Sequence, residues 1–181
     1  MNFHPLTVRC AWESPLGPMS LSASPTGLSG VFFDDQRHLP DMHRWPQVTH
    51  NVFIHETILW LQAYFDGQVE AVKQPFTVPL DLQGGTDFQQ SVWHALLRVP
   101  AGQTESYGQV AQHLNKPQAV RAVGAAVGRN PISIIVPCHR IVGASGQLTG
   151  YAGGLWRKEK LLQLENACPA VAAHRLTPTL F

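Results

Sequence analysis

The sequence has few of the features that mark secreted, membrane-spanning or zinc-binding proteins. Its 181 residues include only three cysteines, with no C-x-x-C pair and no H-x-x-x-H pair, so neither a disulfide framework nor a metal site is expected. No apolar run approaches the roughly 18 to 20 residues that a membrane span requires. The first ten residues, MNFHPLTVRC, lack the basic start and apolar block of a signal peptide. We therefore expect a cytoplasmic protein.

Charged residues are also sparse, at 14% of the chain against 44% apolar residues. This composition is typical of globular proteins and excludes a disordered one. The charges are unevenly divided, because residues 1–83 hold four Lys/Arg against eight Asp/Glu, whereas residues 84–181 hold nine against four. The basic second half indicates an anionic partner, although chance partition of so few charges explains the asymmetry equally well.

Turn residues divide the first half of the chain into short apolar runs typical of strands. Prolines and glycines between the runs favour antiparallel hairpins; the runs span residues 6–13, 18–24 and 27–33. Apolar residues recur through residues 51–66 and predict a helix, which Asp66-Gly67 ends. We therefore expect a small antiparallel sheet and one helix in a supporting domain, residues 1–83.

Prolines and glycines over residues 67–85 mark a junction, so a second domain is expected over residues 84–181. Its first helix is indicated by Thr86-Asp87-Phe88-Gln89, which has capping-box spacing. A further helix is expected at residues 157–165, and the Ala/Pro-rich tail, residues 166–181, is expected to be only partly ordered. The whole chain is expected to be α+β, with a mostly helical second domain.

Residues 107–129 predict a helix-turn-helix. Val110, Ala111 and Leu114 form one short apolar stripe, and the turn Asn115-Lys116-Pro117 leads into a second helix from about residue 118 to residue 127. Such helical hairpins are common, so the pattern alone does not establish DNA binding.

The second helix of this pair carries mostly small side chains, and Arg121 and Arg129 are its only charges. The small residues are Ala119, Ala122, Gly124, Ala125, Ala126 and Gly128. Such a helix can pack tightly against the protein core, or it can approach a DNA groove with Arg121 projecting from it. One arginine on a surface of small side chains is better suited to insertion into a base stack than to phosphate binding.

The stretch IIVPCHRIVG, residues 134–143, places a lone cysteine between a proline and a histidine. The β-branched run Ile134-Ile135-Val136 predicts a buried strand that Pro137 ends. Cys138 and His139 then contact one another only if the chain turns here, because neighbours on an extended strand point to opposite sides.

A free thiol has a pKa of about 8.5, so a nucleophilic Cys138 needs a base to accept its proton. His139 is the candidate base, and Glu165 is the candidate to hold the tautomer of the histidine. A buried cysteine is also often no more than a small apolar residue. Cysteine–histidine pairs serve thiol hydrolases as well, although the signatures of those enzymes are not found in the sequence.

Several stretches together resemble the O6-alkylguanine-DNA alkyltransferases, also called methylated-DNA–protein-cysteine methyltransferases. They are RAVG at 121–124, Asn130-Pro131, PCHR at 137–140, GYAGG with RKEKLLQLE over 150–165 and, more weakly, SPLGPMSL at 14–21. The resemblance runs continuously from about Thr86 to Glu165, and PCHR in this context is highly specific. It implies DNA repair by a single, irreversible transfer of the alkyl group of O6-alkylguanine, and also of O4-alkylthymine, to a cysteine.

The resemblance assigns expected roles in the chemistry. Cys138 matches the alkyl acceptor, and His139 matches the residue that relays its proton, through a water, to Glu165. Asn130 is expected to orient the segment before the cysteine. The resemblance implies no cofactor, no membrane contact and no obligate protein partner.

The resemblance also assigns expected contacts with double-stranded DNA. Arg121 matches the arginine that fills the space of the extruded nucleotide, on a helix that enters the minor groove. Tyr107 matches the tyrosine that clashes with the target phosphate and hydrogen-bonds the flipped base. Lys116 and Gly124, in the turn and on the second helix, are expected to contact DNA as well.

The base pocket follows from the same resemblance. Tyr151 is expected to wall the pocket, and the backbone around Ala152 and Gly153 to donate to the guanine oxygen. The carbonyl groups of Cys138 and Ile141 are expected to accept the exocyclic amine. Ala152 departs from relatives that have serine there; this costs little if the backbone amide does the work, and otherwise widens the pocket.

Two other classes of protein share parts of this pattern. A damage-sensing, non-enzymatic alkyltransferase-like protein would bind the same DNA, but such proteins lack the acceptor cysteine that Cys138 matches. A helix-turn-helix regulator would need a dimer interface or sensor domain, and the sequence indicates neither. Relatives that bind zinc use Cys and His in the first domain, where this chain has Pro5, Ser24 and Ser29.

Overall fold

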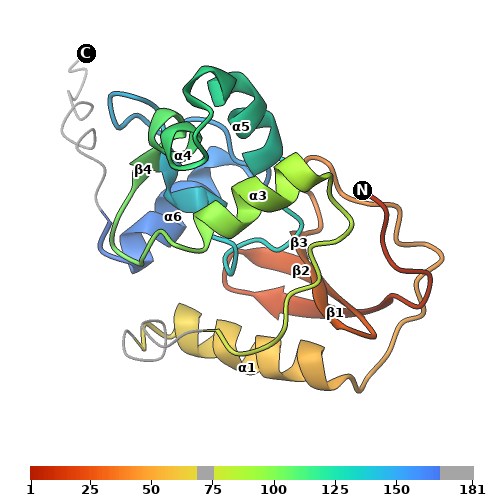
Figure 1. The fold of residues 1–181 in the computed structure, drawn as a ribbon. Helices are drawn as coiled ribbons and strands as arrows, with labels where there is room; N and C mark the ends of the chain where they lie inside the picture. Colours follow the sequence, from red (N-terminus) through yellow and green to blue (C-terminus); the bar gives the residue numbers. More distant parts are fainter. Residues whose placement is uncertain (69–75, 168–181) are drawn as a thin grey trace, which may run out of the picture.

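The computed structural model describes residues 1–68 and 76–167 and has an α+β fold (Figure 1). Its sheet consists of β1 (Val8–Ser14), β2 (Gly17–Ser24) and β3 (Gly27–Phe33), which pair antiparallel in that order. The first hairpin pairs Ser14 with Gly17, and Gly17 has a φ of 106°, which favours glycine. The expected hairpins are confirmed, with β1 beginning two residues later than predicted.

Helix α1 (Val52–Phe65) follows the sheet and contacts all three of its strands. Asn51 caps it by accepting a hydrogen bond from the Ile54 N–H at 3.2 Å. The helix ends at Asp66-Gly67, as its sequence predicts. In Figure 1, α1 lies on the opposite side of the sheet from the other helices.

The second half is mostly helical. Its helices are α3 (Asp87–Leu96), α4 (Tyr107–His113), α5 (Val120–Val127) and α6 (Leu155–Leu164), and a 3-10 turn, Pro117–Ala119, joins α4 to α5. The capping box at Thr86 is present, and Ser106 forms a second one before α4. Within the described residues, no helix has the length and apolarity to cross a membrane.

The prediction of a strand at Ile134-Ile135-Val136 is wrong. Ile134 has a φ of 72°, outside the extended region, and the Val136 N–H donates back to the Ile132 carbonyl at 3.0 Å. The segment instead forms tight buried turns, and its apolar side chains fill the core without pairing as a strand. Extended structure comes after the cysteine, where β5 (Ile141–Val142) pairs parallel with β4 (Glu105–Ser106).

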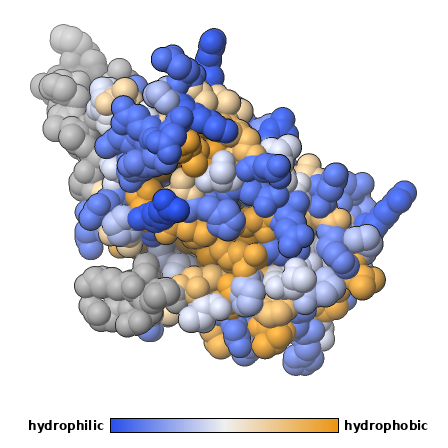
Figure 2. All heavy atoms as spheres, viewed as in Figure 1, coloured by the Kyte–Doolittle hydropathy of each residue, from blue (hydrophilic) through white to orange (hydrophobic). Residues whose placement is uncertain are grey.

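Both predicted domains contribute to one hydrophobic core. Strand β3 binds the second half directly, because the Val31 N–H donates to Pro131 and the Val31 carbonyl accepts from Ser133, both at 2.9 Å. The sheet edge therefore fixes the turns that precede Cys138. On the face drawn in Figure 2, apolar residues gather across the middle, where the sheet and α3 lie in Figure 1. The division at residue 83 stays a prediction.

Candidate active site

A 3-10 turn, Cys138–Arg140, presents the cysteine and the histidine. The Arg140 N–H donates to the Pro137 carbonyl at 3.0 Å, and the Cys138 N–H donates to Val136 at 2.8 Å. These bonds provide the turn that a contact between adjacent side chains requires. Cys138, His139 and Arg140 are all buried, so the polar groups need partners inside the protein.

Asn130 connects the thiol to the turns before it. Its Nδ2 donates to Cys138 Sγ at 3.0 Å and to the Val136 carbonyl at 2.8 Å, while its Oδ1 accepts from the Ile132 N–H at 3.0 Å. The side chain is 4% exposed. Asn130 therefore connects the buried turns with the sulfur, and its orienting role stays a prediction.

The surroundings of Cys138 favour a protonated thiol at rest. Burial raises the pKa of Cys138 above its ordinary value, and the hydrogen bond from Asn130 and the charge of Lys158 oppose that rise only in part. A thiolate therefore forms only when a base accepts the proton.

His139 is placed to be that base. Its Nε2 lies 2.8 Å from Glu165 Oε1, so the carboxylate selects the tautomer that carries its proton on Nε2. Nδ1 is then a free acceptor, and it is buried with no partner among the described residues. Burial, which Glu165 opposes, lowers the pKa of His139. The neutral imidazole can accept a proton on Nδ1 while Glu165 stabilises the cation that results.

Glu165 is held by more donors than the sequence indicates. Arg140 donates from Nε to Oε2 at 2.8 Å and from Nη2 to Oε1 at 2.9 Å, and the Tyr64 hydroxyl donates to Oε1 at 2.8 Å. The hydrogen bonds and charges of His139 and Arg140 outweigh burial and hold the pKa of Glu165 far below its usual range. Glu165 therefore stays a carboxylate.

Sequence reasoning missed three residues of this site: Tyr64, Arg140 and Lys158. Arg140 belongs to the PCHR stretch, and its place beside two candidate residues was a usable signal. Lys158 lies at helical spacing from buried Leu161 and Leu162, which marks it as part of the inner face of α6. Tyr64 gave no signal, because 101 residues separate it from Glu165.

Lys158 connects two segments of the site by hydrogen bonds. Its Nζ is buried and donates to the carbonyl groups of Ile141, Thr149 and Gly150, the second at 2.7 Å. Burial lowers the pKa of Lys158 to about 8. The Ile141 carbonyl, predicted to accept an amine of the base, therefore already accepts one hydrogen bond and has a second lone pair available.

The loop over residues 150–154, which is expected to form part of the base pocket, begins beside the Tyr107 hydroxyl. Tyr107 donates from its hydroxyl to the Thr149 carbonyl at 3.2 Å, and Tyr151 is buried with a hydroxyl that has no partner among residues 1–68 and 76–167. The backbone N–H groups of Ala152 and Gly153 likewise donate to nothing in the described chain. A hollow beside this loop is lined by Tyr151, Ala152 and Gly153, together with Asp35 and Arg37 of the first half.

The predicted DNA-contacting residues of the helix-turn-helix lie on its surface. Arg121 and Lys116 are exposed, and Arg121 donates no hydrogen bond within the described part of the chain. Helix α5 buries Val123, Ala126 and Val127 and exposes Ala122 and Ala125. Core packing therefore accounts for one side of this helix and leaves a small-residue face with Arg121 in solvent, near Gly124.

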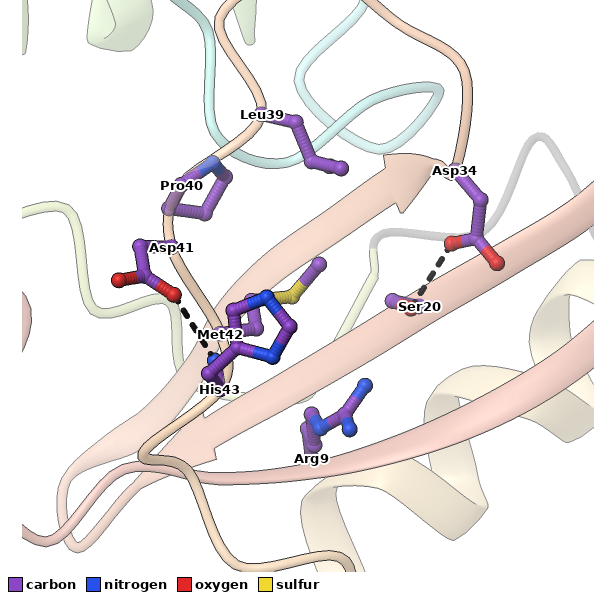
Figure 3. Close-up of a pocket in the computed structure, with 8 residues that line it drawn as sticks. All are labelled: Arg9, Ser20, Asp34, Leu39, Pro40, Asp41, Met42 and His43. Carbon is purple, nitrogen blue, oxygen red and sulfur yellow. Dashed lines mark hydrogen bonds between the residues drawn. The ribbon is translucent and has the colours of Figure 1, made fainter.

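A separate pocket lies against the sheet in the first half (Figure 3). Its carboxylates are already engaged, since Asp34 accepts from the Ser20 hydroxyl at 2.8 Å and Asp41 accepts from the His43 N–H at 3.0 Å. None of the predicted site residues lines it. The described residues contain no cluster of three or more metal-ligating side chains, and the absence of a metal stays a prediction.

The comparisons with known proteins match both halves of the chain. The family model described as "6-O-methylguanine DNA methyltransferase, DNA binding domain" matches residues 87–167. The "Methylated-DNA--protein-cysteine methyltransferase" of Mycobacterium leprae is 48% identical, with 84% of this chain and 88% of that protein covered. The protein of the same name from Methanosarcina acetivorans is 46% identical, with 87% of this chain and 97% of that protein covered.

Solved structures agree with the sequence comparisons. Mycobacterium tuberculosis OGT in complex with DNA has a TM-score of 0.78 and 44% identity over 90% of this chain and 95% of that one. The O6-methylguanine-DNA methyltransferase of Pyrococcus kodakaraensis, at 22% identity and a TM-score of 0.59, shares the fold. On the identity and coverage of these relatives, the chain belongs to the methylated-DNA–protein-cysteine methyltransferase family.

Proposed function

We propose that this protein repairs duplex DNA by moving the alkyl group of O6-alkylguanine onto Cys138, once per molecule. The observation that carries the proposal is the buried pair His139–Glu165, hydrogen-bonded at 2.8 Å, directly after the buried thiol of Cys138, which accepts a hydrogen bond from Asn130. Among the described residues, Nδ1 of His139 has no hydrogen-bond partner, and Cys138, which must lose a proton, is the preceding residue in the chain. The names of the relatives support the same activity.

The transfer is a displacement at the alkyl carbon. The Cys138 proton passes, through a water, to Nδ1 of His139, and Glu165 stabilises the imidazolium that forms. The thiolate attacks the alkyl carbon; the sulfur–carbon bond forms as the carbon–O6 bond breaks, and the electron pair stays on guanine O6. The N–H groups of Ala152 and Gly153 stabilise that oxygen, and Tyr107 helps deliver the proton that restores guanine. The thioether product is not hydrolysed by water, so the thiol is used once and no cofactor takes part.

The target nucleotide must leave the duplex before Cys138 can reach its alkyl carbon. Extrusion costs a few kcal/mol, and we propose that Arg121 offsets this cost by occupying the vacated space from the minor groove. The exposed small-residue face of α5, with Ala122 and Ala125, lets the helix backbone approach the groove. Lys116 contacts the phosphate backbone beside it. The same site suits O4-alkylthymine, and we propose no obligate protein partner.

Mass spectrometry after incubation with a duplex that carries one O6-methylguanine tests the proposal. We expect each protein molecule to gain one methyl group in place of the thiol hydrogen, and Cys138→Ser to gain none. A native chain that gains no methyl group, or a gain that persists in Cys138→Ser, would refute the transfer. Lesion-selective binding without any mass gain would favour the damage-sensing class.

A further inference from the structure

The far end of the proton network is built by the first half of the chain. Tyr64 lies in the last turn of α1 and is 2% exposed. Its hydroxyl donates to Glu165 Oε1 at 2.8 Å. This contact joins a helix beneath the sheet to the carboxylate that holds the base of the reaction, and the transfer described above assigns no role to it.

Tyr64 and His139 share one acceptor atom. Oε1 of Glu165 also accepts from His139 Nε2 at 2.8 Å and from Arg140 Nη2 at 2.9 Å. A carboxylate oxygen offers about two lone-pair sites, so three donors divide its negative charge among them. Each added donor therefore weakens the attraction that Glu165 exerts on the imidazole proton.

The Tyr64 hydroxyl is fixed as a donor. Its ring stacks on Trp60 with centroids 5.5 Å apart and meets Phe65 edge-on at 5.4 Å. Burial, together with the negative charge of Glu165, raises the pKa of Tyr64 well above its ordinary value. The hydroxyl therefore keeps its proton at every pH at which the reaction runs, and the rigid ring directs it at the carboxylate.

Other titratable groups face the same cluster. They are Arg140 from the 3-10 turn, Lys158 from α6, and Cys138 and Tyr151 at the pocket. Arg140 binds both carboxylate oxygens of Glu165, through Nε to Oε2 and through Nη2 to Oε1. Of the hydrogen-bond donors to Glu165 in the described chain, only Tyr64 comes from the first half.

We propose that Tyr64 is a positioning residue that limits the basicity of His139 through Glu165, so that the first half of the chain sets the lower pH limit of alkyl transfer. The proposal rests on the proposed function, in which neutral His139 accepts the Cys138 proton. Without the Tyr64 hydroxyl, Glu165 offers more charge to His139, and the imidazole becomes protonated at a higher pH. A protonated imidazole cannot accept the thiol proton, so transfer then fails at a higher pH.

Tyr64→Phe tests this prediction because it removes the donor and keeps the ring. NMR titration of the His139 imidazole in the full chain, without DNA, measures its pKa; single-turnover transfer across pH measures the acid limb. We expect both to move upward by about 0.5 to 1 pH unit. The matched control is Thr57→Val, which removes another buried α1 hydroxyl, donating to the Phe53 carbonyl at 2.6 Å, and leaves both values unchanged.

Site-specific 3-fluorotyrosine at position 64 gives a second measurement with the opposite sign. Fluorine makes the phenol a stronger donor without changing the fold, so the His139 pKa and the acid limb should move downward. Tyr64→Phe and fluorotyrosine proteins that both keep the native titration and acid limb would overturn the proposal. The NMR titration does not depend on alkyl transfer. A native chain that fails to take up a methyl group would therefore refute the proposed function, while the NMR titration would still test whether Tyr64 lowers the pKa of His139.

Discussion

At the scale of single residues, the site combines a protonated thiol with a neutral imidazole that can accept its proton. Burial raises the pKa of Cys138 and lowers the pKa of His139. Both shifts favour the neutral pair, a thiol beside an uncharged imidazole, over the ion pair. We therefore propose that the thiolate forms only as the alkylated base docks.

The protonated state of Cys138 has a measurable consequence. The DNA-free protein should react slowly with iodoacetamide at pH 7, and the rate at Cys138 should increase only at a higher pH than the rate of a free thiol does, because burial raises the pKa of Cys138. Peptide mapping separates Cys138 from Cys10, which is partly exposed and serves as the internal control. Rapid modification of Cys138 at pH 7, faster than that of Cys10, would contradict a thiol at rest.

The sequence identified the residues of the site that belong to a contiguous motif or match the family. Cys138 and His139 adjoin one another, and Asn130 and Glu165 match family positions. Tyr64 could not be found, because its role depends on the meeting of α1 with the end of α6, and no periodicity in either segment encodes that contact. Arg140 and Lys158 were missed because a charged side chain is usually solvated, whereas here each is enclosed by acceptors.

At the scale of elements, local signals were sufficient where a segment forms its own structure. The hairpins, the end of α1 and the N-terminal cap of α3 were predictable because turn glycines and capping side chains act within a few residues. The run Ile134-Ile135-Val136 was misinterpreted, because β-branched residues favour strands only where a neighbouring strand is available. Here β3 pairs with Pro131 and Ser133 instead, and the run turns.

Helix α5 carries the prediction that belongs to this scale. Arg121→Ala should slow repair of duplex DNA by about tenfold or more, because removing an intercalating side chain returns part of an extrusion cost of a few kcal/mol. Reaction with free O6-benzylguanine should change by less than about twofold, since no nucleotide is extruded. Transfer rates on both substrates measure the difference.

A matched control separates extrusion from simple loss of charge. Arg98→Ala removes another exposed arginine, outside the helix-turn-helix, and should reduce duplex repair only slightly. Equal losses on both substrates in Arg121→Ala would exclude the extrusion role and indicate a damaged pocket.

At the scale of the whole molecule, buried contacts join the two halves of the chain. Buried Arg157 of α6 donates to the Leu16 carbonyl at 2.8 Å and to the Gly153 carbonyl at 2.9 Å, and it lies over the ring of Phe33 at 4.3 Å. The Arg37 N–H donates to the Ala152 carbonyl at 3.0 Å. The first half therefore holds the loop that contains Ala152 and Gly153. The junction predicted from prolines and glycines marks a change in composition and does not reveal these contacts.

Replacing Arg157 should affect stability and chemistry together. Arg157→Met should lower the free energy of unfolding by about 3 kcal/mol, because it leaves buried carbonyls unpaired, and should also slow transfer by loosening the loop at Gly153. Asp35→Asn should cost less than about 1 kcal/mol, because the Asp35 side chain is 68% exposed. Urea denaturation and single-turnover rates measure both effects. Equal losses of stability in the two variants would contradict the buried contacts as the source.

The central claim is that Cys138 accepts one alkyl group and is then spent. Its most direct test is a count of repaired guanines per protein molecule with O6-[methyl-¹⁴C]methylguanine duplex in excess, followed by peptide mapping of the label. The account predicts a plateau at one guanine restored per molecule, with all the label on the peptide that contains Cys138. Continued turnover past one equivalent, or label on any other residue, would contradict it.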